Sequence, residues 1–470
     1  MRPLEAVLLL VLLAGFLAGA VPAIRTTWLA RRVPLAVALA ASAQVLVEGA
    51  RWQMAPAYAL ALAMVLVSRR GSPEGAAGWR RVLGEAAVTG PAALVLALAA
   101  ALPFAIPVPR LPAPDGPYGV GTATYHWIDT ARPEIFTAAP DDRRELMVQV
   151  WYPTRPGHTG RRAPYVEDGA ALAPLARLLR LPGFVLSHLP LIRTSAVVDA
   201  PAAAGRPFPV LLFSHGRAGF RQHNTFQVEH LVSHGYVVAT IDHPYAASGV
   251  RFPDGRTASF DLRLQDRRFF DRVMPYLAED ASFSLDQLTE VNREDPKGLL
   301  TGRLDLARAG MFGLSMGGVI TAETCLRDAR FKACLPMDVH MPADVVAAGL
   351  AQPTMWISRD AATMRREGWA EADVIETQTT MRSVFASLRA PGYLVLAPGM
   401  YHQDLSDFTA LIWPPLGRRL GLYGSLDGAR SHAVIKAYSL AFFDRHLKGE
   451  PAPLLDGPSA GYPEVIFAPR

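Results

Sequence analysis

The hexapeptide Gly313-Leu314-Ser315-Met316-Gly317-Gly318 constrains the fold of this 470-residue chain more than any other stretch. A mostly apolar run, residues 307–312, precedes it, and a sequence typical of a helix, Val319–Arg327, follows it. A G-x-S-x-G pattern between a strand and a helix forms a turn so tight that only glycine fits on either side of the serine. Such a turn lifts the hydroxyl above the sheet and directs the next N–H group, that of Met316, at a developing oxyanion. Since the pattern also occurs in ordinary loops, the chain must supply a base, an acid and a second oxyanion donor.

The charged residues are distributed unevenly along the chain. Residues 1–108 contain 9 of the 47 Lys and Arg residues and 4 of the 42 Asp and Glu residues, which accounts for the whole net charge of +5. The remainder contains 38 residues of each sign and is neutral. A neutral C-terminal portion does not support nucleic-acid binding, which needs a basic stripe.

Four apolar segments lie in the first 109 residues: Ala6–Ile24, Val33–Val47, Trp52–Ser68 and Ala86–Pro109. The first has 19 residues without a charge, which is long enough to span a bilayer. The second and third have 15 and 17 uncharged residues and are expected to form a helical hairpin. We therefore expect about four transmembrane helices. Ala18-Gly19-Ala20 also fits a signal-peptidase site, which would make the first segment a cleaved signal peptide.

The positions of the arginines predict how these helices are oriented. The loops after the first and third segments are rich in arginine: Arg25, Arg31, Arg32, Arg69, Arg70, Arg80 and Arg81. The loop between the second and third contains Arg51, offset by Glu48. The positive-inside rule places the arginine-rich loops in the cytoplasm. We therefore expect an integral protein of a bacterial inner or cell membrane, with its C-terminal portion facing outward, periplasmic or extracellular.

Six prolines between Pro103 and Pro117 are expected to end the helical region, because proline lacks the N–H that a helix needs. The expected organisation is a transmembrane helical region at 1–109, a proline-rich linker at 110–118 and a catalytic domain at 119–470. Within that domain, the apolar stretch 165–196 is expected to be a packed helical insertion, with a lid as the alternative.

Strands and helices alternate from Phe208 onward, as in a mostly parallel sheet with helices on both faces. The expected strands are Gly119–Thr130, Glu145–Pro153, Val210–Phe213, Val237–Ile241, Ala309–Gly313, Ala333–Met337, Thr354–Ile357 and Tyr393–Ala397, and Val434–Leu447 is expected to be the closing helix. With the serine turn after the strand at 309–313, this order predicts an α/β-hydrolase fold.

His402 is the expected base. The order Ser…Asp…His of this fold leaves four histidines after the serine: His340, His402, His432 and His446. His432 and His446 fall on or beside the closing helix, whereas His402 follows the strand Tyr393–Ala397. A loop beyond that strand can carry an imidazole over Ser315.

The second oxyanion donor is expected from the turn after the strand Val210–Phe213. There we assign the N–H of Arg217, paired with the N–H of Met316. Two aspartates qualify as the acid that orients His402: Asp338 ends the strand after the serine helix, and Asp360 ends the next one. The pattern alone leaves both open.

The cysteines, Cys325 and Cys334, lack the paired C-x-x-C spacing of a zinc site. We expect two buried side chains rather than a disulfide, which is the alternative in an oxidising compartment.

Six motifs occur in order between about Leu111 and Lys448: Pro114–Gly121, Arg144–Pro153, Phe213–Gly216, the serine turn, Met337-Asp338 and His402–Phe408. In these motifs the chain resembles the plasma and type II platelet-activating factor acetylhydrolases. The acid of that family follows the strand after the nucleophile helix, so the resemblance implies Asp338, with Asp360 in reserve. It further implies calcium-independent hydrolysis of an acyl ester by a Ser315–His402–Asp338 triad, with no cofactor and no metal. The implied substrate is a phospholipid with a short or oxidised sn-2 chain.

Three features depart from the family pattern. Leu314 stands where a histidine commonly precedes the serine, Arg217 replaces an apolar residue, and the animal enzymes have no transmembrane region. The alternatives are a general carboxylesterase, either dienelactone-hydrolase-like or polyester-cleaving, and, in another class, a non-catalytic membrane binding or sensing module. The expected partners are a lipid or small ester and the membrane, not nucleic acid.

Overall fold

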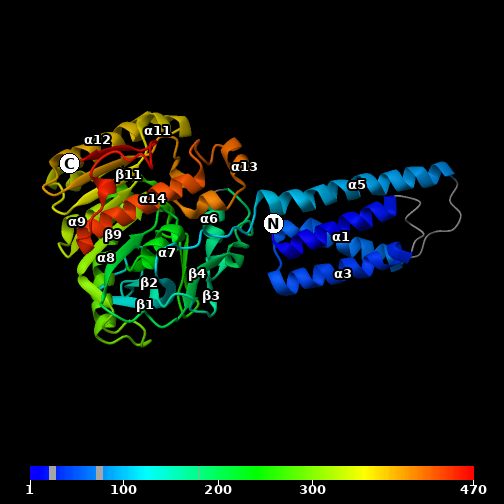
Figure 1. Ribbon diagram of the computed structural model, residues 1–470, viewed down its shortest axis with the longest axis horizontal. Coiled ribbons are helices and arrows are strands. Elements are labelled where there is room, and N and C mark those ends of the chain that lie inside the picture. The colour runs from blue at the N-terminus through cyan, green and yellow to red at the C-terminus, as the bar shows by residue number, and fades with distance from the viewer. Residues whose placement is uncertain (21–27, 70–77, 179) are drawn as a thin grey trace. The chain divides into compact units, whose positions relative to one another are not determined.

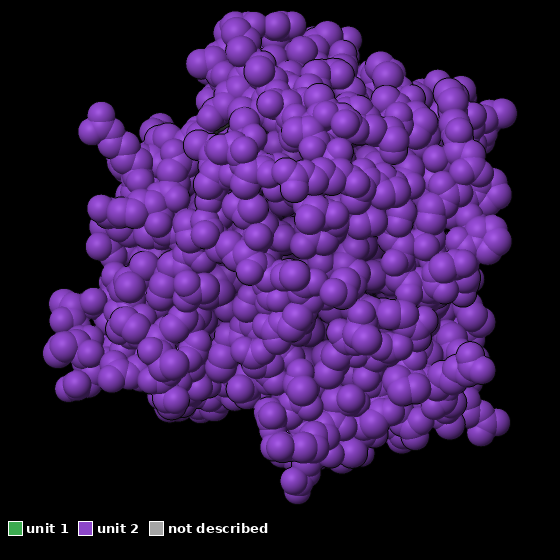
Figure 2. Space-filling view, turned by 90° about the vertical axis from the view of Figure 1, so that its left-hand side faces the viewer, with its two compact units in different colours: residues 1–109, 187–192, 411–416 green, residues 110–186, 193–410, 417–470 purple. Residues whose placement is uncertain are grey.

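The computed structural model describes residues 1–20, 28–69, 78–178 and 180–470, which form two compact units. Unit 1 comprises Met1–Pro109 and two short segments from later in the chain, Ser187–Ile192 and Leu411–Leu416. Unit 2 comprises Arg110–Leu186, Arg193–Ala410 and Gly417–Arg470. Figure 2 shows a face of unit 2 with all its atoms drawn.

Unit 1 is a set of packed helices, drawn in blue in Figure 1. Its elements are α1 (Pro3–Ala20), α3 (Trp28–Glu48), the 3₁₀ turn η1 (Trp52–Met54), α4 (Ala55–Arg69) and α5 (Gly78–Ala105). Apolar side chains from several helices meet in one core, in which Leu8, Val37 and Ala57 are fully buried. The core also encloses an ion pair, since Arg51 Nε lies 2.6 Å from Glu5 Oε1 and neither side chain is exposed.

Helices form where the sequence predicts membrane spans, but no helix in the described ranges is long and apolar enough to cross a membrane. α4 has 15 residues, or about 22 Å at the usual rise, short of a bilayer core of about 30 Å. The sequence of α3 includes Arg31, Arg32 and Pro34. The prediction of four transmembrane helices is therefore not supported. Residues 21–24 of the first predicted span, and Arg25 and Arg70 of the loops, lie outside the described residues.

Two details of the helical region differ from expectation. α5 continues through Pro103 to Ala105, so the first proline of the series does not end it. Arg51 donates to the carbonyl oxygens of Pro103 at 3.4 Å and Ile106 at 2.7 Å, which lack partners within the helix. Arg51 is therefore engaged by Glu5 and this helix end. Glu48 accepts the backbone N–H of Leu4 at 2.7 Å.

Unit 2 is built on a sheet in which eleven strands of the described chain are hydrogen-bonded in the order β13-β12-β11-β10-β9-β5-β6-β2-β1-β4-β3. The strands are β1 (Gly119–Pro133), β2 (Arg143–Thr154), β3 (Arg162–Pro164), β4 (Arg193–Val198), β5 (Phe208–Ser214), β6 (Val237–Asp242), β9 (Leu304–Leu314), β10 (Phe331–Met337), β11 (Thr354–Ser358), β12 (Gly392–Leu396) and β13 (Ile466–Pro469). A separate hairpin joins β7 (Gly249–Arg251) to β8 (Thr257–Ser259). The six strands β6, β5, β9, β10, β11 and β12 are parallel neighbours, as predicted.

Helices cover both faces of this sheet (Figure 1). The helices that follow α5 in the chain are α6 (Ala173–Leu178), α7 (Thr225–Ser233), α8 (Arg267–Arg293), α9 (Met316–Arg327), α10 (Ala343–Ala348), α11 (Ala361–Glu367), α12 (Glu371–Ser387), α13 (Pro414–Arg419) and α14 (Gly428–Phe443). Alternate side chains of β5 enter different cores, because successive residues of a strand point to opposite faces. Val210 and Leu212 pack in the core that includes α8 and α9. Leu211 and Phe213 pack in the core that includes α7 and α14.

Cys325 of α9 and Cys334 of β10 form a disulfide, with their Cα atoms 6.6 Å apart. The expectation of two unpaired side chains is therefore wrong. Since nine residues separate the cysteines, the helix–strand connection returns Cys334 beside Cys325. The bond fastens the helix that follows Ser315 to the strand that precedes Asp338.

The stretch 165–196 contains the six-residue helix α6 and the start of β4. Tyr165, Leu175 and Ile192 are buried. Residues 187–192 belong to unit 1, and Leu179 lies outside the described residues. Helical structure in this stretch is thus shorter than expected.

Candidate active site

Ser315 lies on the turn between β9 and α9, with φ +57° and ψ −124°. A non-glycine residue pays energy to adopt this backbone conformation, which persists where the surroundings enforce it. A Cβ on Gly317 would lie 1.9 Å from the carbonyl oxygen of Ser214, and one on Gly313 would lie 2.2 Å from that of Gly317. The turn therefore has the close backbone approach that the motif predicts.

Asp338 and His402 meet at the edge where the parallel strands end. Asp338 directly follows β10, and His402 begins a 3₁₀ turn (η5, His402–Leu405) after β12. His402 Nδ1 lies 2.5 Å from Asp338 Oδ2. Ser315 belongs to the same edge, because Leu314 of β9 pairs with Met337 of β10 and the N–H of Ser315 donates to Met337 at 2.9 Å. Two of the three residues predicted to act together are thus in direct contact.

The carboxylate of Asp338 is buried and surrounded by donors. Ser358 Oγ donates to Oδ1 at 2.9 Å, and Arg359 Nε donates to the same oxygen at 3.1 Å. Burial alone would raise the pKa of Asp338, but the Arg359 guanidinium and the hydrogen bond from His402 hold it well below its usual range. Because an ionised carboxylate only accepts hydrogen bonds, the proton of His402 lies on Nδ1 and its Nε2 is left as a base.

Arg359 is a site residue that the sequence reasoning missed. Its fully buried guanidinium pairs with Asp338 Oδ2 at 3.0 Å and with Glu367. It also lies 4.4 Å from the ring centre of Trp369, whose ring is 5.5 Å from that of His402. Glu367 in turn accepts the backbone N–H of His402 at 3.2 Å. The available signal was its position, directly after the carboxyl end of β11.

Asp360, the reserve acid, has another role. It is the N-cap of α11, where its side chain accepts the N–H and the hydroxyl of Thr363. An aspartate at this position satisfies a free N–H of the first helical turn. His402 is thus hydrogen-bonded to Asp338, whereas Asp360 is bound to the first turn of α11.

Two backbone N–H groups lie near Ser315, that of Met316 at the start of α9 and that of Arg217 in the turn after β5. Met316 is the first residue of α9, so its N–H has no acceptor within the helix. In the turn, Ala218 N–H donates to Ala246 and Gly219 N–H to Gly216, whereas Arg217 N–H has no backbone acceptor in the described chain. A Cβ on Gly216 would lie 3.4 Å from Ser315 Cβ, so the turn runs directly past the serine. Neither N–H group has a backbone acceptor among the described residues.

A second Ser–His–Asp arrangement lies in the interior of unit 2. Ser214 Oγ is 2.9 Å from His243 Nε2, and His243 Nδ1 is 2.8 Å from Asp280 Oδ2. All three residues are fully buried. Arg144 Nη2 donates a hydrogen bond to Asp280 Oδ2 at 2.6 Å. Since no substrate can reach fully buried atoms, this chain of hydrogen bonds is structural.

One group of side chains in the described residues has the composition of a metal site: Asp115, His230 and His234, with ligand atoms within 4.8 Å of one another. His230 Nδ1 already bonds Asp115 at 2.6 Å, and Lys436 Nζ lies 3.5 Å from the same carboxylate. The neighbouring ammonium opposes the binding of a second cation there.

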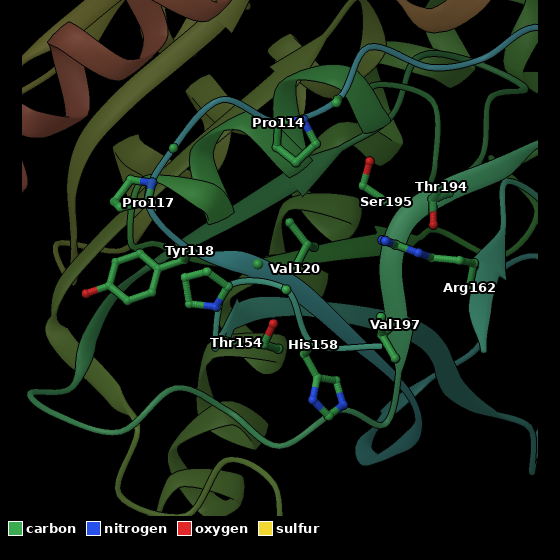
Figure 3. Close-up of a pocket in the computed structure, with 15 residues that line it drawn as sticks. Pro114, Pro117, Tyr118, Val120, Thr154, His158, Arg162, Thr194, Ser195 and Val197 are labelled. Carbon is green, nitrogen blue, oxygen red and sulfur yellow. The ribbon is translucent and has the colours of Figure 1, made fainter. Parts of the chain in front are cut away.

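A cavity of about 340 Å³ opens beside β1 and β4. Figure 3 shows Pro117 and Tyr118 on one side of it, and Thr194, Ser195 and Arg162 on the other. Its lining does not include Ser315, Asp338 or His402. The candidate catalytic residues therefore do not line this cavity.

The amino-acid sequence matches the model of a known protein family. Residues 107–252 and 295–451 match the family model "Platelet-activating factor acetylhydrolase, isoform II". These segments make up more than half of the chain and contain every residue discussed above around Ser315. The chain belongs to this family.

Two curated relatives agree with the assignment. The platelet-activating factor acetylhydrolase of Cavia porcellus is 24% identical over 364 residues, 72% of this chain and 78% of the relative. The "Probable 1-alkyl-2-acetylglycerophosphocholine esterase" of Arthroderma benhamiae is 27% identical over 384 residues, 76% of this chain and 93% of the relative.

A solved structure, the ferulic acid esterase from Streptomyces cinnamoneus, is also similar. It is 32% identical with a TM-score of 0.63, over 77% of this chain and 99% of the esterase. This likeness and the mostly parallel sheet agree with the predicted α/β-hydrolase fold. This likeness and the family membership together show that the protein is a carboxylic ester hydrolase.

Proposed function

We propose that this esterase cleaves its substrate through an acyl-enzyme on Ser315. His402 Nε2 removes the proton of Ser315 Oγ as the oxygen attacks the ester carbonyl carbon. The N–H groups of Arg217 and Met316 stabilise the resulting oxyanion. His402 then returns the proton to the departing alcohol, leaving an ester on Ser315. Water, deprotonated by the same imidazole, attacks that ester and releases the acid.

The contact between His402 Nδ1 and Asp338 Oδ2, 2.5 Å long, is the observation that supports this mechanism most. A buried ionised carboxylate fixes the tautomer that leaves Nε2 free, and it stabilises the imidazolium that forms during attack. The strained turn of Ser315 and the two free N–H groups supply the other parts of the reaction.

For the substrate we propose a short acyl ester at the sn-2 position of a phospholipid. The names of the two curated relatives support an acetyl ester of an alkyl glycerophosphocholine. The Streptomyces cinnamoneus structure favours a second candidate, an ester of a phenolic acid, because its identity to this chain is higher.

A substrate panel separates these candidates. The purified protein would be assayed with 1-alkyl-2-acetylglycerophosphocholine, methyl ferulate and p-nitrophenyl acetate, with Ser315→Ala as the control. Preferred hydrolysis of the acetyl phospholipid supports the first candidate. A kcat/KM for methyl ferulate at least tenfold higher than that for the acetyl phospholipid supports the second candidate substrate instead of the first. Activity confined to p-nitrophenyl acetate indicates a general carboxylesterase, and full activity in Ser315→Ala rejects the mechanism.

We also propose that unit 2 functions in an oxidising compartment outside the cytoplasm. The disulfide Cys325–Cys334 supports this location, because cytosolic thiols are normally kept reduced. Alkylating intact cells with a thiol reagent before lysis tests it. Protection of both cysteines until reductant is added is the expected result, and immediate labelling of both would contradict the proposal.

A further inference from the structure

One buried side chain beside Ser315 has no partner for either of its polar atoms. His223 precedes α7 and is 7% exposed. Its Nδ1 and Nε2 are both buried without a hydrogen-bond partner in the part of the chain that the structure describes. Buried polar groups are almost always paired, because leaving one unpaired lowers stability. An unpaired imidazole next to a nucleophile therefore suggests a partner that arrives with the substrate.

The imidazole faces the turn that carries the free Arg217 N–H. The position that a Cβ on Gly216 would occupy lies 3.5 Å from His223 Cε1 and 3.4 Å from Ser315 Cβ. A Cβ on Gly219 would lie 2.9 Å from His223 Nδ1. Cε1 is bonded to both ring nitrogens. Either nitrogen, whichever bears the proton, therefore lies close to the turn at Gly216.

Two aromatic rings also lie beside the imidazole. Its centre lies 4.9 Å from that of Phe408 and 5.8 Å from that of Phe220. The backbone of His223 is fixed on both sides, since its N–H donates to Phe220 at 2.9 Å and its carbonyl accepts from Asp407 at 3.1 Å. The ring is therefore held in place by groups that offer its nitrogens no acceptor.

The surroundings of His223 favour its neutral form. Burial, together with the nearby His215 and His402, lowers the pKa of His223 to about 3. A neutral imidazole has one N–H donor and one acceptor nitrogen. With its pKa lowered in this way, the ring stays neutral near pH 7 and keeps one N–H as a donor.

We propose that the ring N–H of His223 donates a hydrogen bond to the carbonyl oxygen of the bound ester, beside the N–H groups of Arg217 and Met316. The proposal rests on the role of Ser315 given above. It adds a third donor, from a side chain, to the two backbone donors predicted from the sequence.

The test compares His223→Leu with His223→Gln and His223→Asn. His223→Leu removes the donor, so kcat is expected to fall ~10–100-fold with KM within about twofold, as for loss of an oxyanion donor. Its Tm is expected to equal or exceed that of the wild type, because an apolar side chain replaces an unpaired polar one. Gln and Asn place an amide N–H near the positions of Nε2 and Nδ1, and one of them is expected to recover part of kcat.

His432→Leu is the matched control for the stability measurement. His432 is as buried as His223, 6% exposed, but its Nε2 bonds Thr409 Oγ1 at 3.1 Å and the carbonyl oxygen of Ser406 at 3.0 Å. Loss of these bonds is expected to lower Tm. The proposal is overturned if His223→Leu keeps the wild-type kcat, or if it loses Tm as His432→Leu does and neither amide variant recovers activity. If Ser315→Ala retains hydrolysis, the proposed function fails instead, whatever the His223 variants do.

Discussion

Asp338 Oδ2 lies 2.5 Å from His402 Nδ1, although 64 residues separate them in the chain. The sheet makes this contact, because β10 and β12 flank β11 and all three end at the same edge. Arg359, at the end of the intervening strand, binds the same carboxylate. The candidate site is thus assembled from residues that directly follow neighbouring strands.

Asp338→Asn is expected to lower kcat by about 10⁴-fold, because an amide at this position favours the wrong imidazole tautomer. Steady-state kinetics with p-nitrophenyl acetate measure this loss. Asp360→Ala is the comparison: it removes the cap of α11 and should cost about 1 kcal/mol of stability while kcat stays within about twofold. Equal loss of kcat in both variants would contradict the assignment of Asp338.

Arg359→Met is expected to lower the free energy of unfolding by about 3–5 kcal/mol, because it leaves the buried carboxylate of Asp338 and the partly buried carboxylate of Glu367 without their cation. Urea denaturation followed by fluorescence measures the change. Arg359→Lys should recover only part of it, since an ammonium cannot bind both carboxylates through a planar fork. Wild-type stability in Arg359→Met would show that the ion pairs of Arg359 contribute little to the free energy of unfolding.

Gly317→Ala is expected to prevent folding or abolish activity, because its Cβ would lie 1.9 Å from the carbonyl oxygen of Ser214. Gly457→Ala is the control, since a Cβ there would meet no atom within 4 Å. Circular dichroism and thermal melting distinguish the two. Normal melting and turnover of Gly317→Ala would mean that the turn at Ser315 is looser than described.

Reduction of the disulfide Cys325–Cys334 is expected to destabilise the protein by about 2–3 kcal/mol, the loop-closure effect for a loop of this size. Activity at 25 °C should persist, because the bond does not contact the reacting atoms. Thermal melts with and without dithiothreitol measure the shift. The double variant Cys325→Ser/Cys334→Ser should melt at the lower temperature and ignore the reductant, and a reductant-sensitive double variant would refute this explanation.

The buried histidines predict how stability depends on pH. Burial lowers the pKa of His432 to about 4, whereas the unfolded chain has a histidine pKa of about 6.5. Below pH 6.5 the unfolded state therefore binds a proton that the folded state does not, so stability falls as the pH falls towards 4. Between pH 7 and pH 5, the wild type should lose about 2 kcal/mol more than His432→Gln. Urea denaturation at both pH values gives this difference; parallel losses would contradict it.

The central strands and the serine turn could be predicted because their sequence signals are local. Short apolar runs bounded by turn residues identified β5, β6, β9, β10, β11 and β12. The spacing of Gly313, Ser315 and Gly317 identified the turn. The antiparallel strand β13 has no such signal, since it follows a long irregular segment after α14.

Features that depend on tertiary contacts were less predictable. The sequence pattern left Asp338 and Asp360 equal, and the distinction lies in which carboxylate meets His402 and which caps α11. The pairing of Cys325 with Cys334 likewise depends on how α9 returns to β10. The membrane prediction relied on apolar composition, which also describes the packed helices of unit 1.

The reaction of Ser315 with a fluorophosphonate is the measurement that tests the account most directly. The probe would be added to the wild type, Ser315→Ala and Ser214→Ala, and the modified peptide identified by mass spectrometry. A single adduct on Ser315 is expected in the wild type and in any folded Ser214→Ala protein, with loss of esterase activity, and no adduct is expected in Ser315→Ala. An adduct on another residue, or undiminished turnover in Ser315→Ala, would contradict it.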